Sequence, residues 1–403
     1  YSPELLICKV GASFLFSDCL RLARVMPTMI IVNSFVPYLF ASGIFGWGMA
    51  LLLTRASVVL ARRYGVLAYP NRRASHSVPT PRLGGLGIVG AFYAHMLLLD
   101  AQGYFSPAPW KTTLLVGGAW AFVGGLLDDL LHLDFRWKFL FQFAAAAAAV
   151  AVGFSVLPEP LDALLARTAP FWREFAAALF TIFFIVFFMN VFNFMDGMDG
   201  QAAIFGALAA VAFVLPAASF ALPNTLGEIT AAGTLAGALF GFFQFFNRPG
   251  ALPKRKTFMG DCGSQFVGFA LAVLALRREQ TTFDVFDFWC AVIALSPFIW
   301  DVCYTLVRRL LRGENIFEAH RTHLYQRLLV AGWTHGEVLA LNFALWGLCF
   351  ILAQLRGRLL RDGAAHWLAS VFFVDITVLL AYTLCVLFAE RRAAGKNSAA
   401  SVS

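Results

Sequence analysis

The chain alternates between long apolar blocks and short polar stretches. Most of the blocks are roughly 17–25 residues long, the length that a helix needs to cross the hydrocarbon core of a bilayer. Each block predicts one helix, at 30–55, 84–100, 112–128, 136–156, 172–192, 202–222, 230–246, 263–276, 285–307, 336–356 and 367–389. The pattern therefore predicts an all-α membrane protein with about 10–11 transmembrane helices.

Composition supports this class. Of the 403 residues 60% are hydrophobic and 13% are charged, whereas a soluble domain is about half apolar and a quarter charged. No polar stretch is long enough for a second domain, so 29–390 is interpreted as one polytopic domain and 391–403 as a cytoplasmic tail. Residues 1–28 are interpreted as an extension upstream of a native start at Met26 or Met29. The seven scattered Cys predict neither a disulfide framework nor a zinc site.

The basic residues are distributed among short loops. The net charge of +8 does not gather in one stripe or tail, so no nucleic-acid partner is expected. Counted by alternate loops, one side holds about 19 Lys and Arg and the other about 8. The positive-inside rule places the richer side in the cytoplasm.

Five polar clusters follow the first, third, fifth, seventh and ninth apolar blocks, and so share the predicted cytoplasmic side. They lie at 76–82, 128–134, 190–199, 254–264 and 318–327. A charged group at the bilayer centre costs about 2.5–3.5 kcal/mol. A site at the membrane boundary, with water or a metal ion, would satisfy several carboxylates at once. Such a site suits a reaction between a soluble charged substrate and a lipid.

Each cluster alone also has a simpler interpretation. Asp128 and Asp129 could be solvated carboxylates at a helix end, and 196–200 could be a glycine-rich turn. Against this, Asp196 and Asp199 are three residues apart and would share one face of a helical turn. The Gly85–Gly90 stretch spells G-x-G-x-x-G but opens an apolar block, which favours close helix packing over nucleotide binding. Four histidines have no evident partner and are interpreted as incidental: His95, His132, His335 and His366.

The order and spacing of these motifs resemble the polyprenyl-phosphate N-acetylhexosamine-1-phosphate transferase family, which is glycosyltransferase family 4-like. The resemblance runs from about residue 69 to residue 327. The motifs are H-x-x-P-T-P-R-L-G-G at 76–85, G-L-L-D-D at 125–129, N-x-x-N-x-x-D-G-x-D-G at 190–200, F-M-G-D-x-G-S at 258–264 and H-R-x-H at 320–323. Five ordered motifs form a highly specific signal.

The resemblance implies roles for individual residues. Asp261 is expected to bind Mg²⁺, for which Mn²⁺ is an alternative, with Asn193 as a second ligand. Asp128 and Asp129 are expected where a lipid phosphate meets a sugar diphosphate. The catalytic residues implied are Asp128, Asp129, Asp261 and His323. The substrate-binding residues implied are Asn193, Asp196, Asp199, Lys138, Arg321, Arg327, His76 and Arg82, of which Asp196 and Asp199 would hold the uridine end.

The function implied is transfer of a sugar 1-phosphate from a UDP-sugar to undecaprenyl phosphate, with release of UMP. The setting implied is the bacterial inner membrane, at the start of O-antigen, lipopolysaccharide or other cell-wall polysaccharide synthesis. The partners are the UDP-sugar, undecaprenyl phosphate and membrane lipid, and a homodimer is left open.

The loop His323–Gln326 reads H-L-Y-Q, where the family commonly has H-x-H-H. This form resembles a branch that uses deoxy-N-acetylhexosamines such as FucNAc or QuiNAc. An N-acetylglucosamine-1-phosphate transferase is the alternative within the family. A secondary transporter is the alternative of another class, and it would place ionisable residues near the midplane instead of at one face.

Overall fold

A computed structural model describes residues 37–70, 78–103, 108–159, 161–215, 225–252, 254–278, 287–316, 320–361 and 368–400. The predicted extension at 1–28 and His76 and His366 lie outside these residues. The described chain is a bundle of helices with one two-stranded hairpin.

A helix stands at each of the eleven predicted places. These helices are Pro37–Arg63, α2 (Gly85–Ala101), α3 (Pro109–Leu131), α4 (Phe135–Ala151), α6 (Pro170–Met195), α7 (Gln201–Val214), α8 (Thr225–Phe242), α9 (Gly260–Arg277), α10 (Phe288–Leu311), α12 (His335–Arg361) and α13 (Leu368–Ala400). The smaller elements are β1 (Leu67–Ala68), β2 (Thr80–Pro81), α5 (Leu161–Leu165), the π-helix η2 (Phe243–Asn247) and α11 (Leu324–Val330).

The prediction of an all-α, multi-pass membrane protein is confirmed. By length and composition, seven helices among the described residues are long and apolar enough to cross a membrane, and α2 and α7 are shorter apolar helices. This is fewer than the 10–11 spans predicted from the apolar blocks. The difference arises because some blocks form shorter helices, such as the 14-residue α7, and because α9 carries polar residues in its first turns.

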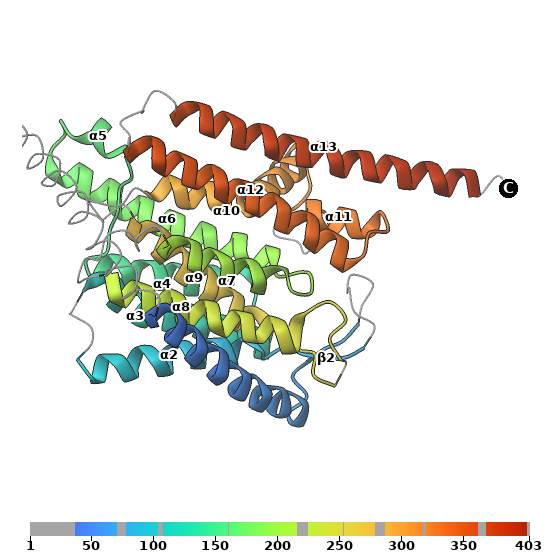
Figure 1. The fold of residues 1–403 in the computed structure, drawn as a ribbon, viewed down its shortest axis with the longest axis horizontal. Coiled ribbons are helices and arrows are strands. Elements are labelled where there is room, and N and C mark those ends of the chain that lie inside the picture. Colours follow the sequence, from blue (N-terminus) through green and yellow to red (C-terminus); the bar gives the residue numbers. More distant parts are fainter. Residues whose placement is uncertain are drawn as a thin grey trace, which may run out of the picture.

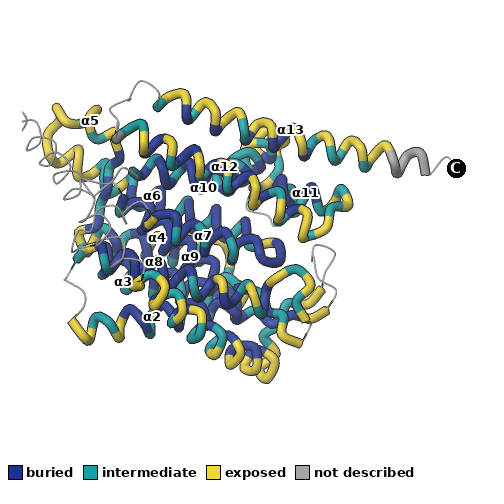
Figure 2. The backbone as a smooth tube through the Cα atoms, viewed as in Figure 1, coloured by how far each residue is buried: buried dark blue, intermediate teal, exposed yellow. Residues whose placement is uncertain are grey.

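Helix α9 is the centre of the bundle. It packs against α2, α3, α6, α7, α8 and α10, and every residue from Cys262 to Leu276 is buried. The burial-coloured trace shows this inner region in dark blue and the outer helices with exposed faces in yellow (Figure 2). A helix that is apolar all round is expected in such a position. Its first turn therefore emerges from the core at one end of the bundle.

Small residues allow the helices beside α9 to approach closely. A Cβ at Gly85 would collide with the backbone of Gly263, and a Cβ at Gly125 would collide with the carbonyl of Asp261. A Cβ at Gly87 would collide with Thr54 on the first helix. The packing interpretation of the G-x-G-x-x-G stretch is thus confirmed.

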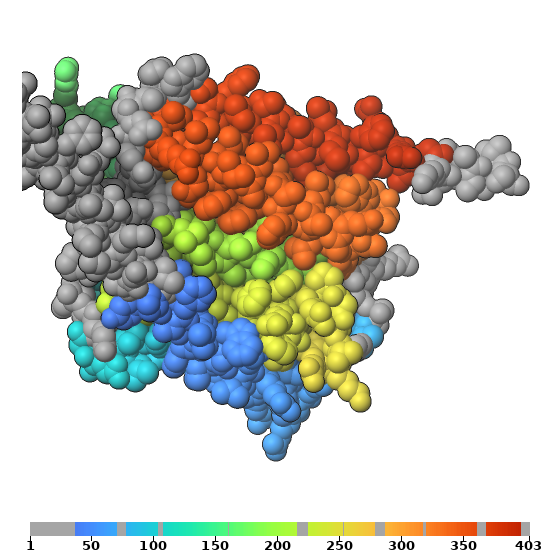
Figure 3. Space-filling view, in the orientation of Figure 1, coloured from blue at the N-terminus to red at the C-terminus, as the bar shows by residue number. Residues whose placement is uncertain are grey.

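The two ends of the bundle differ. The β1–β2 hairpin and α11 lie at one end and α5 at the other, while α13 continues beyond its neighbours (Figure 1). Residues 391–400, expected as a tail, continue α13 as helix. The C-terminal helices, orange to red, form one long side of the molecule, and the N-terminal helices, blue and cyan, lie on the opposite side (Figure 3).

Candidate active site

A large polar cavity opens at the end of the bundle that carries the hairpin and α11. Its volume is about 1170 Å³. The lining residues come from the hairpin region, the ends of α3 and α6, the start of α9, α11 and the start of α12. The polar ones are Arg82, His132, Asn193, Asp196, Asp199, Asn247, Asp261, His320, Arg321, Gln326 and His335. All five predicted clusters thus contribute to one cavity, the 128–134 cluster through His132.

The hairpin is fixed to the chain segment that leads into α9. Leu67 pairs with Pro81 and Ala68 with Thr80 in antiparallel register. The Pro81 carbonyl accepts from the N–H of Phe258 at 2.9 Å, and the N–H of Gly84 donates to the Phe258 carbonyl at 3.0 Å. These bonds hold Arg82 at the cavity wall, where its guanidinium lies 3.0 Å from Nε2 of His132.

Asp129 supports the first turn of α9. Its carboxylate accepts the backbone N–H of Asp261 at 3.0 Å and that of Cys262 at 2.9 Å. The first N–H groups of a helix lack partners within the helix, and an acceptor from elsewhere can satisfy them. Gly260, with φ at 75°, makes the turn that brings these groups to Asp129. Asp129 therefore holds Asp261 in place and has both oxygens occupied, which differs from the substrate-facing role predicted for it.

Asp128, the neighbouring carboxylate, points to a different partner. Its Oδ2 lies 2.5 Å from Nζ of Lys138, and the same Nζ lies 3.2 Å from Oδ2 of Asp261. The other oxygen of Asp261 accepts from the side-chain amide of Asn193 at 2.7 Å. We call Asp128, Lys138, Asn193 and Asp261 the ion centre. It joins the first turn of α9 to α3, α4 and α6.

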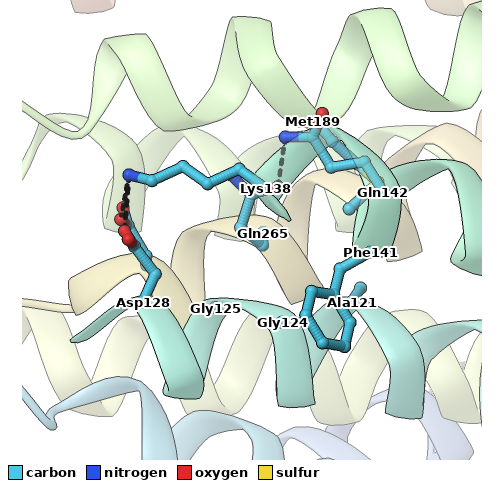
Figure 4. A pocket seen from close by; sticks show the side chains of 10 residues that line it. Ala121, Gly124, Gly125, Asp128, Lys138, Phe141, Gln142, Met189 and Gln265 are labelled. Carbon is cyan, nitrogen blue, oxygen red and sulfur yellow. Dashed lines mark hydrogen bonds and ion pairs between the residues drawn. The ribbon is translucent and has the colours of Figure 1, made fainter. Parts of the chain in front are cut away.

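A second, small cavity lies on the other side of the ion centre. Its volume is about 10 Å³, and Figure 4 shows its lining, with Lys138 reaching across to Asp128. Asp261 lines both this cavity and the large one, whereas Asp128 and Lys138 line only the small one. The ion centre is thus the wall between the two spaces.

The two carboxylates of the 196–200 turn have different surroundings. Asp199 lies 2.5 Å from Nζ of Lys256 and 3.6 Å from Nδ1 of His335. Burial would raise the pKa of Asp199, but the hydrogen bonds and charges of His335 and Lys256 outweigh it and lower that pKa. Burial and the charges of Asp261, Asp129 and Asp199 raise the pKa of Asp196 well above its usual value.

The expectation that Asp196 and Asp199 share one helical face is wrong, because α6 ends at Met195 and the chain turns there. Both side chains nevertheless line the large cavity. Gly200, with φ at 81°, completes the turn, and its N–H donates to Asn247 at 2.8 Å.

The histidine of the predicted catalytic set is buried. His323 is 2% exposed, and its Nδ1 lies 3.0 Å from Asp301 on α10. Asp301 also accepts the N–H groups of Leu324 and Tyr325, at 2.9 and 3.1 Å. The carboxylate of Asp301 therefore fixes both the ring of His323 and the start of α11.

The neighbouring residues of this loop divide between cavity and core. His320, Arg321 and Gln326 line the large cavity. Burial and the charges of His323 and Arg309 lower the pKa of His320 to about 4. Arg327 turns away to α13, where its Nε donates to Glu390 at 2.6 Å. Arg327 is buried and does not line the large cavity, so its position does not agree with the predicted role as a diphosphate binder.

Several cavity residues escaped the sequence interpretation. The expectation that these histidines lack partners is wrong for three of them: His132 contacts Arg82, His335 contacts Asp199, and His95 lies 2.6 Å from Thr234. Of these, His132 and His335 line the large cavity. His132 has a left-handed backbone, with φ at 53°, which is uncommon outside glycine and signals a constrained position. Its place next to the Asp128–Asp129 pair was the only available signal in the sequence.

The ion centre has a donor set that fits a magnesium ion. Mg²⁺ is usually bound by one or two carboxylates together with substrate phosphates. Asp261 and Asp128 converge on the single ammonium of Lys138, so their two negative charges already favour a cation at this point. Asn193 donates its amide N–H to Asp261, and a flip of the amide group would present its oxygen to an ion at the same point. No group of three or more His, Cys, Asp or Glu suited to a metal occurs within the described ranges, so any ion here would depend on substrate oxygens.

The fold and cavity define a membrane-embedded helical bundle with a large polar cavity, lined by acidic and basic side chains, at one end. The family described as glycosyl transferase family 4 matches residues 112–279. The chain is 31% identical to a decaprenyl-phosphate N-acetylglucosaminephosphotransferase of Mycobacterium tuberculosis, over 80% of this chain and 83% of that protein.

Two further relatives extend this likeness. A Bacillus subtilis protein, named a probable undecaprenyl-phosphate N-acetylglucosaminyl 1-phosphate transferase, is 28% identical over 82% of this chain and 86% of its own length. An undecaprenyl-phosphate alpha-N-acetylglucosaminyl 1-phosphate transferase of Yersinia pestis is 25% identical over 86% and 91%. The chain belongs to the glycosyltransferase family 4-like polyprenyl-phosphate hexosamine-1-phosphate transferases.

Proposed function

We propose that this enzyme transfers an N-acetylhexosamine 1-phosphate from a UDP-sugar to a polyprenyl phosphate and releases UMP. The observation that carries the proposal is the position of Asp261, which lines both the large polar cavity and the small cavity beside Lys138. A soluble diphosphate could occupy the large cavity while a lipid phosphate approaches from the α3–α4 side. The two phosphates would then meet at the ion centre.

The reaction needs alignment and charge neutralisation more than covalent help from the protein. The lipid phosphate attacks the β-phosphorus of the UDP-sugar, and the bond to the UMP oxygen breaks. Lys138 supplies a positive charge at the wall between the cavities. A Mg²⁺ ion on Asp261 and Asn193 would neutralise phosphate charge when bound. A phosphate monoester has a second pKa near 6, so the attacking group is largely dianionic already.

Asp128 is the carboxylate that we assign to the attacking phosphate, because both oxygens of Asp129 are bound to α9. It would orient Lys138 and accept a residual proton. Asp128→Asn is expected to slow turnover without accumulation of a phosphorylated enzyme. A stable phospho-enzyme in the wild-type protein, detected by mass spectrometry after quenching, would contradict this assignment.

The other end of the donor is assigned to the 196–200 turn. Asp196, Asp199 and Lys256 lie where a nucleoside could be held away from the ion centre. Arg82, Arg321 and His320 add basic or hydrogen-bonding groups to the cavity wall. These groups suit the diphosphate, since arginine binds phosphate in bidentate geometry.

For the sugar we favour N-acetylglucosamine, for which all three relatives above are named. The deoxyhexosamine alternative depends on the His323–Gln326 loop. Of that loop only Gln326 lines the large cavity, while His323, Leu324 and Tyr325 are buried. An O-antigen or other surface-polysaccharide role in a bacterial inner membrane, with the cavity facing the cytoplasm, completes the proposal.

The test is release of UMP by purified protein in detergent, given undecaprenyl or decaprenyl phosphate, Mg²⁺ and a panel of UDP-sugars. The panel includes UDP-GlcNAc and the UDP-linked deoxy-N-acetylhexosamines. Release is expected to require both lipid and Mg²⁺, and to be lost with EDTA or in Asp261→Asn. Asp162→Asn, the same charge change on α5 at the other end of the bundle, is the matched control. No release from folded wild-type protein with any donor would overturn the proposal.

A further inference from the structure

Three amide side chains lie beneath the ion centre, one on each of three helices, with Gln142 and Gln265 buried and Asn190 half-buried. Gln142 on α4 donates through Nε2 to Oδ1 of Asn190 on α6 at 3.1 Å and to Oε1 of Gln265 on α9 at 2.9 Å. Asn190 returns a bond to Oε1 of Gln142 at 2.8 Å. We call these residues the amide triad. Gln142 and Gln265 also line the small cavity, and Figure 4 shows the bond between them.

Each residue of the triad lies about one helical turn from an ion-centre residue on its own helix. Gln142 follows Lys138 by four residues, and Gln265 follows Asp261 by four residues. Asn190 precedes Asn193 by three. Residues three or four apart lie on the same helical face, about one turn of 5.4 Å from each other. Each helix thus presents one ion-centre residue and, one turn deeper, one amide to the same partners.

The amides constrain the helices more tightly than the surrounding apolar contacts do. Gln142 is 3% exposed and Gln265 is 6% exposed, and an unpaired amide in such a place is costly. The Ala144–Ala149 run on α4 has no side-chain group that could make a directional contact. Lys138 cannot set the register either, because its ammonium ends a flexible four-carbon stem. The short, directional amide bonds join α4 to α6 and α9 in one register, and Asn193 joins α6 to α9 in the same register through Asp261 and Ser264.

We propose that Gln142, Asn190 and Gln265 are positioning residues that fix the register of α4, α6 and α9 and so assemble Lys138, Asn193 and Asp261 into one ion centre. None of the three touches the large cavity, so they act on catalysis only through the residues one turn above. The expected effect on turnover rests on the proposed transferase function. The expected effect on the position of Lys138 does not depend on that function.

The test replaces the whole triad by apolar residues of similar size: Gln142→Met, Asn190→Leu and Gln265→Met together. Removing every partner leaves no unpaired amide, and such replacements are often close to neutral for stability. The melting temperature in detergent should therefore stay near that of the wild type. The kcat for UMP release is expected to fall at least tenfold, while KM for the UDP-sugar changes by less than about twofold, because the large cavity is untouched.

A second readout does not depend on turnover. The protein is treated with a limiting amount of a water-soluble amine-acylating reagent, and labelling of Lys138 is compared with that of the exposed Lys254 by peptide mass spectrometry. In the wild type Nζ of Lys138 is paired with both Asp128 and Asp261, although its side chain is 37% exposed. In the triple variant its labelling relative to Lys254 is expected to rise severalfold. Thr383→Val, which removes a buried bond from Trp300 between α10 and α13, should leave both readouts unchanged.

The outcomes separate the two proposals. Unchanged labelling of Lys138 in folded triple variant, or an unchanged kcat, would show that the triad only fills space. Absence of UMP release from the wild type would defeat the transferase proposal, and the labelling would still decide the role of the triad. If the triple variant does not fold, Gln265→Met removes a single interhelical bond, and unchanged labelling there would equally overturn the inference.

Discussion

Buried charge is handled differently at the two ends of this bundle. Glu228, near the start of α8, is 1% exposed and bound by Arg277, at 2.8 Å, and by Arg278. At the other end Asp196 and Asp261 line a large cavity. There the carboxylates of Asp128 and Asp261 share one ammonium.

The contrast shows which buried charges are structural and which are available. The charge of Glu228 is neutralised by neighbouring arginine side chains, so this carboxylate serves to join α8 to the end of α9. Carboxylates that outnumber the cations beside a cavity attract a cation from outside. The comparison can be tested by changing one carboxylate of each kind.

The largest effect is expected from Asp261→Asn. The variant loses one of the two charges that would hold a metal and orient Lys138, so kcat for UMP release should fall by about a hundredfold to a thousandfold. Stability should change little, because Asn can still accept from Asn193. Turnover within tenfold of the wild type would place the catalytic charge elsewhere.

Glu228→Gln should show the opposite pattern. Removing one partner of a buried ion pair leaves cationic groups without their counter-charge, and the expected loss is about 3 kcal/mol of stability. The melting temperature in detergent measures it. Activity per folded molecule should match the wild type. A selective loss of kcat in stable Glu228→Gln protein would mean that the two ends are coupled.

Asp196→Asn should stabilise the protein at the expense of function. The folded pKa of Asp196 is raised by burial and by three neighbouring carboxylates. When the pKa of a carboxyl group is higher in the folded state than in the unfolded state, the folded protein loses stability as the pH rises from the unfolded pKa towards the folded pKa. The gain in the variant should therefore be absent below about pH 4, near the pKa of an unfolded aspartate, and should grow as the pH rises towards neutrality. A melting curve series over pH measures it, and a lower melting temperature at pH 7.5 would contradict the expectation.

Lys256→Met should have the smallest effect, with the opposite dependence on pH. The folded pKa of Asp199 is lowered by His335 and Lys256 despite burial. Stability from such a pair is present above the unfolded pKa and is lost as the pH falls through the folded pKa. The variant should be about 1 kcal/mol less stable at pH 7, and the difference should vanish in acid. Melting temperatures of both proteins at matched pH values decide the point.

The sequence predicted the helices well because apolar length is a local property. It also placed the polar clusters at one end, since charges are excluded from the middle of a span. The positions of individual side chains depended on contacts between distant segments. Asp128 and Asp129 are adjacent, yet only the arrival of α9 makes Asp129 a helix cap. The H-R-x-H spacing gives no sign that Asp301 would bury the second histidine.

The π-helix η2 has a consequence for how the cavity is assembled. Its last residue, Asn247, accepts the N–H of Gly200 at 2.8 Å and donates to the carbonyl of Thr257 at 3.3 Å. A π-turn holds one residue more than an α-turn, and such turns are frequent at functional sites. Deleting one residue from 243–245 would restore the α-helical pitch and move the side chain of Asn247, because a π-turn advances each residue by less than the roughly 100° of an α-helix. Asn247 joins the loop that carries Asp199 to the loop that carries Lys256, 57 residues further along the chain. Without its two hydrogen bonds these loops would lose one of their connections, so the extra residue of η2 helps to decide whether they face each other.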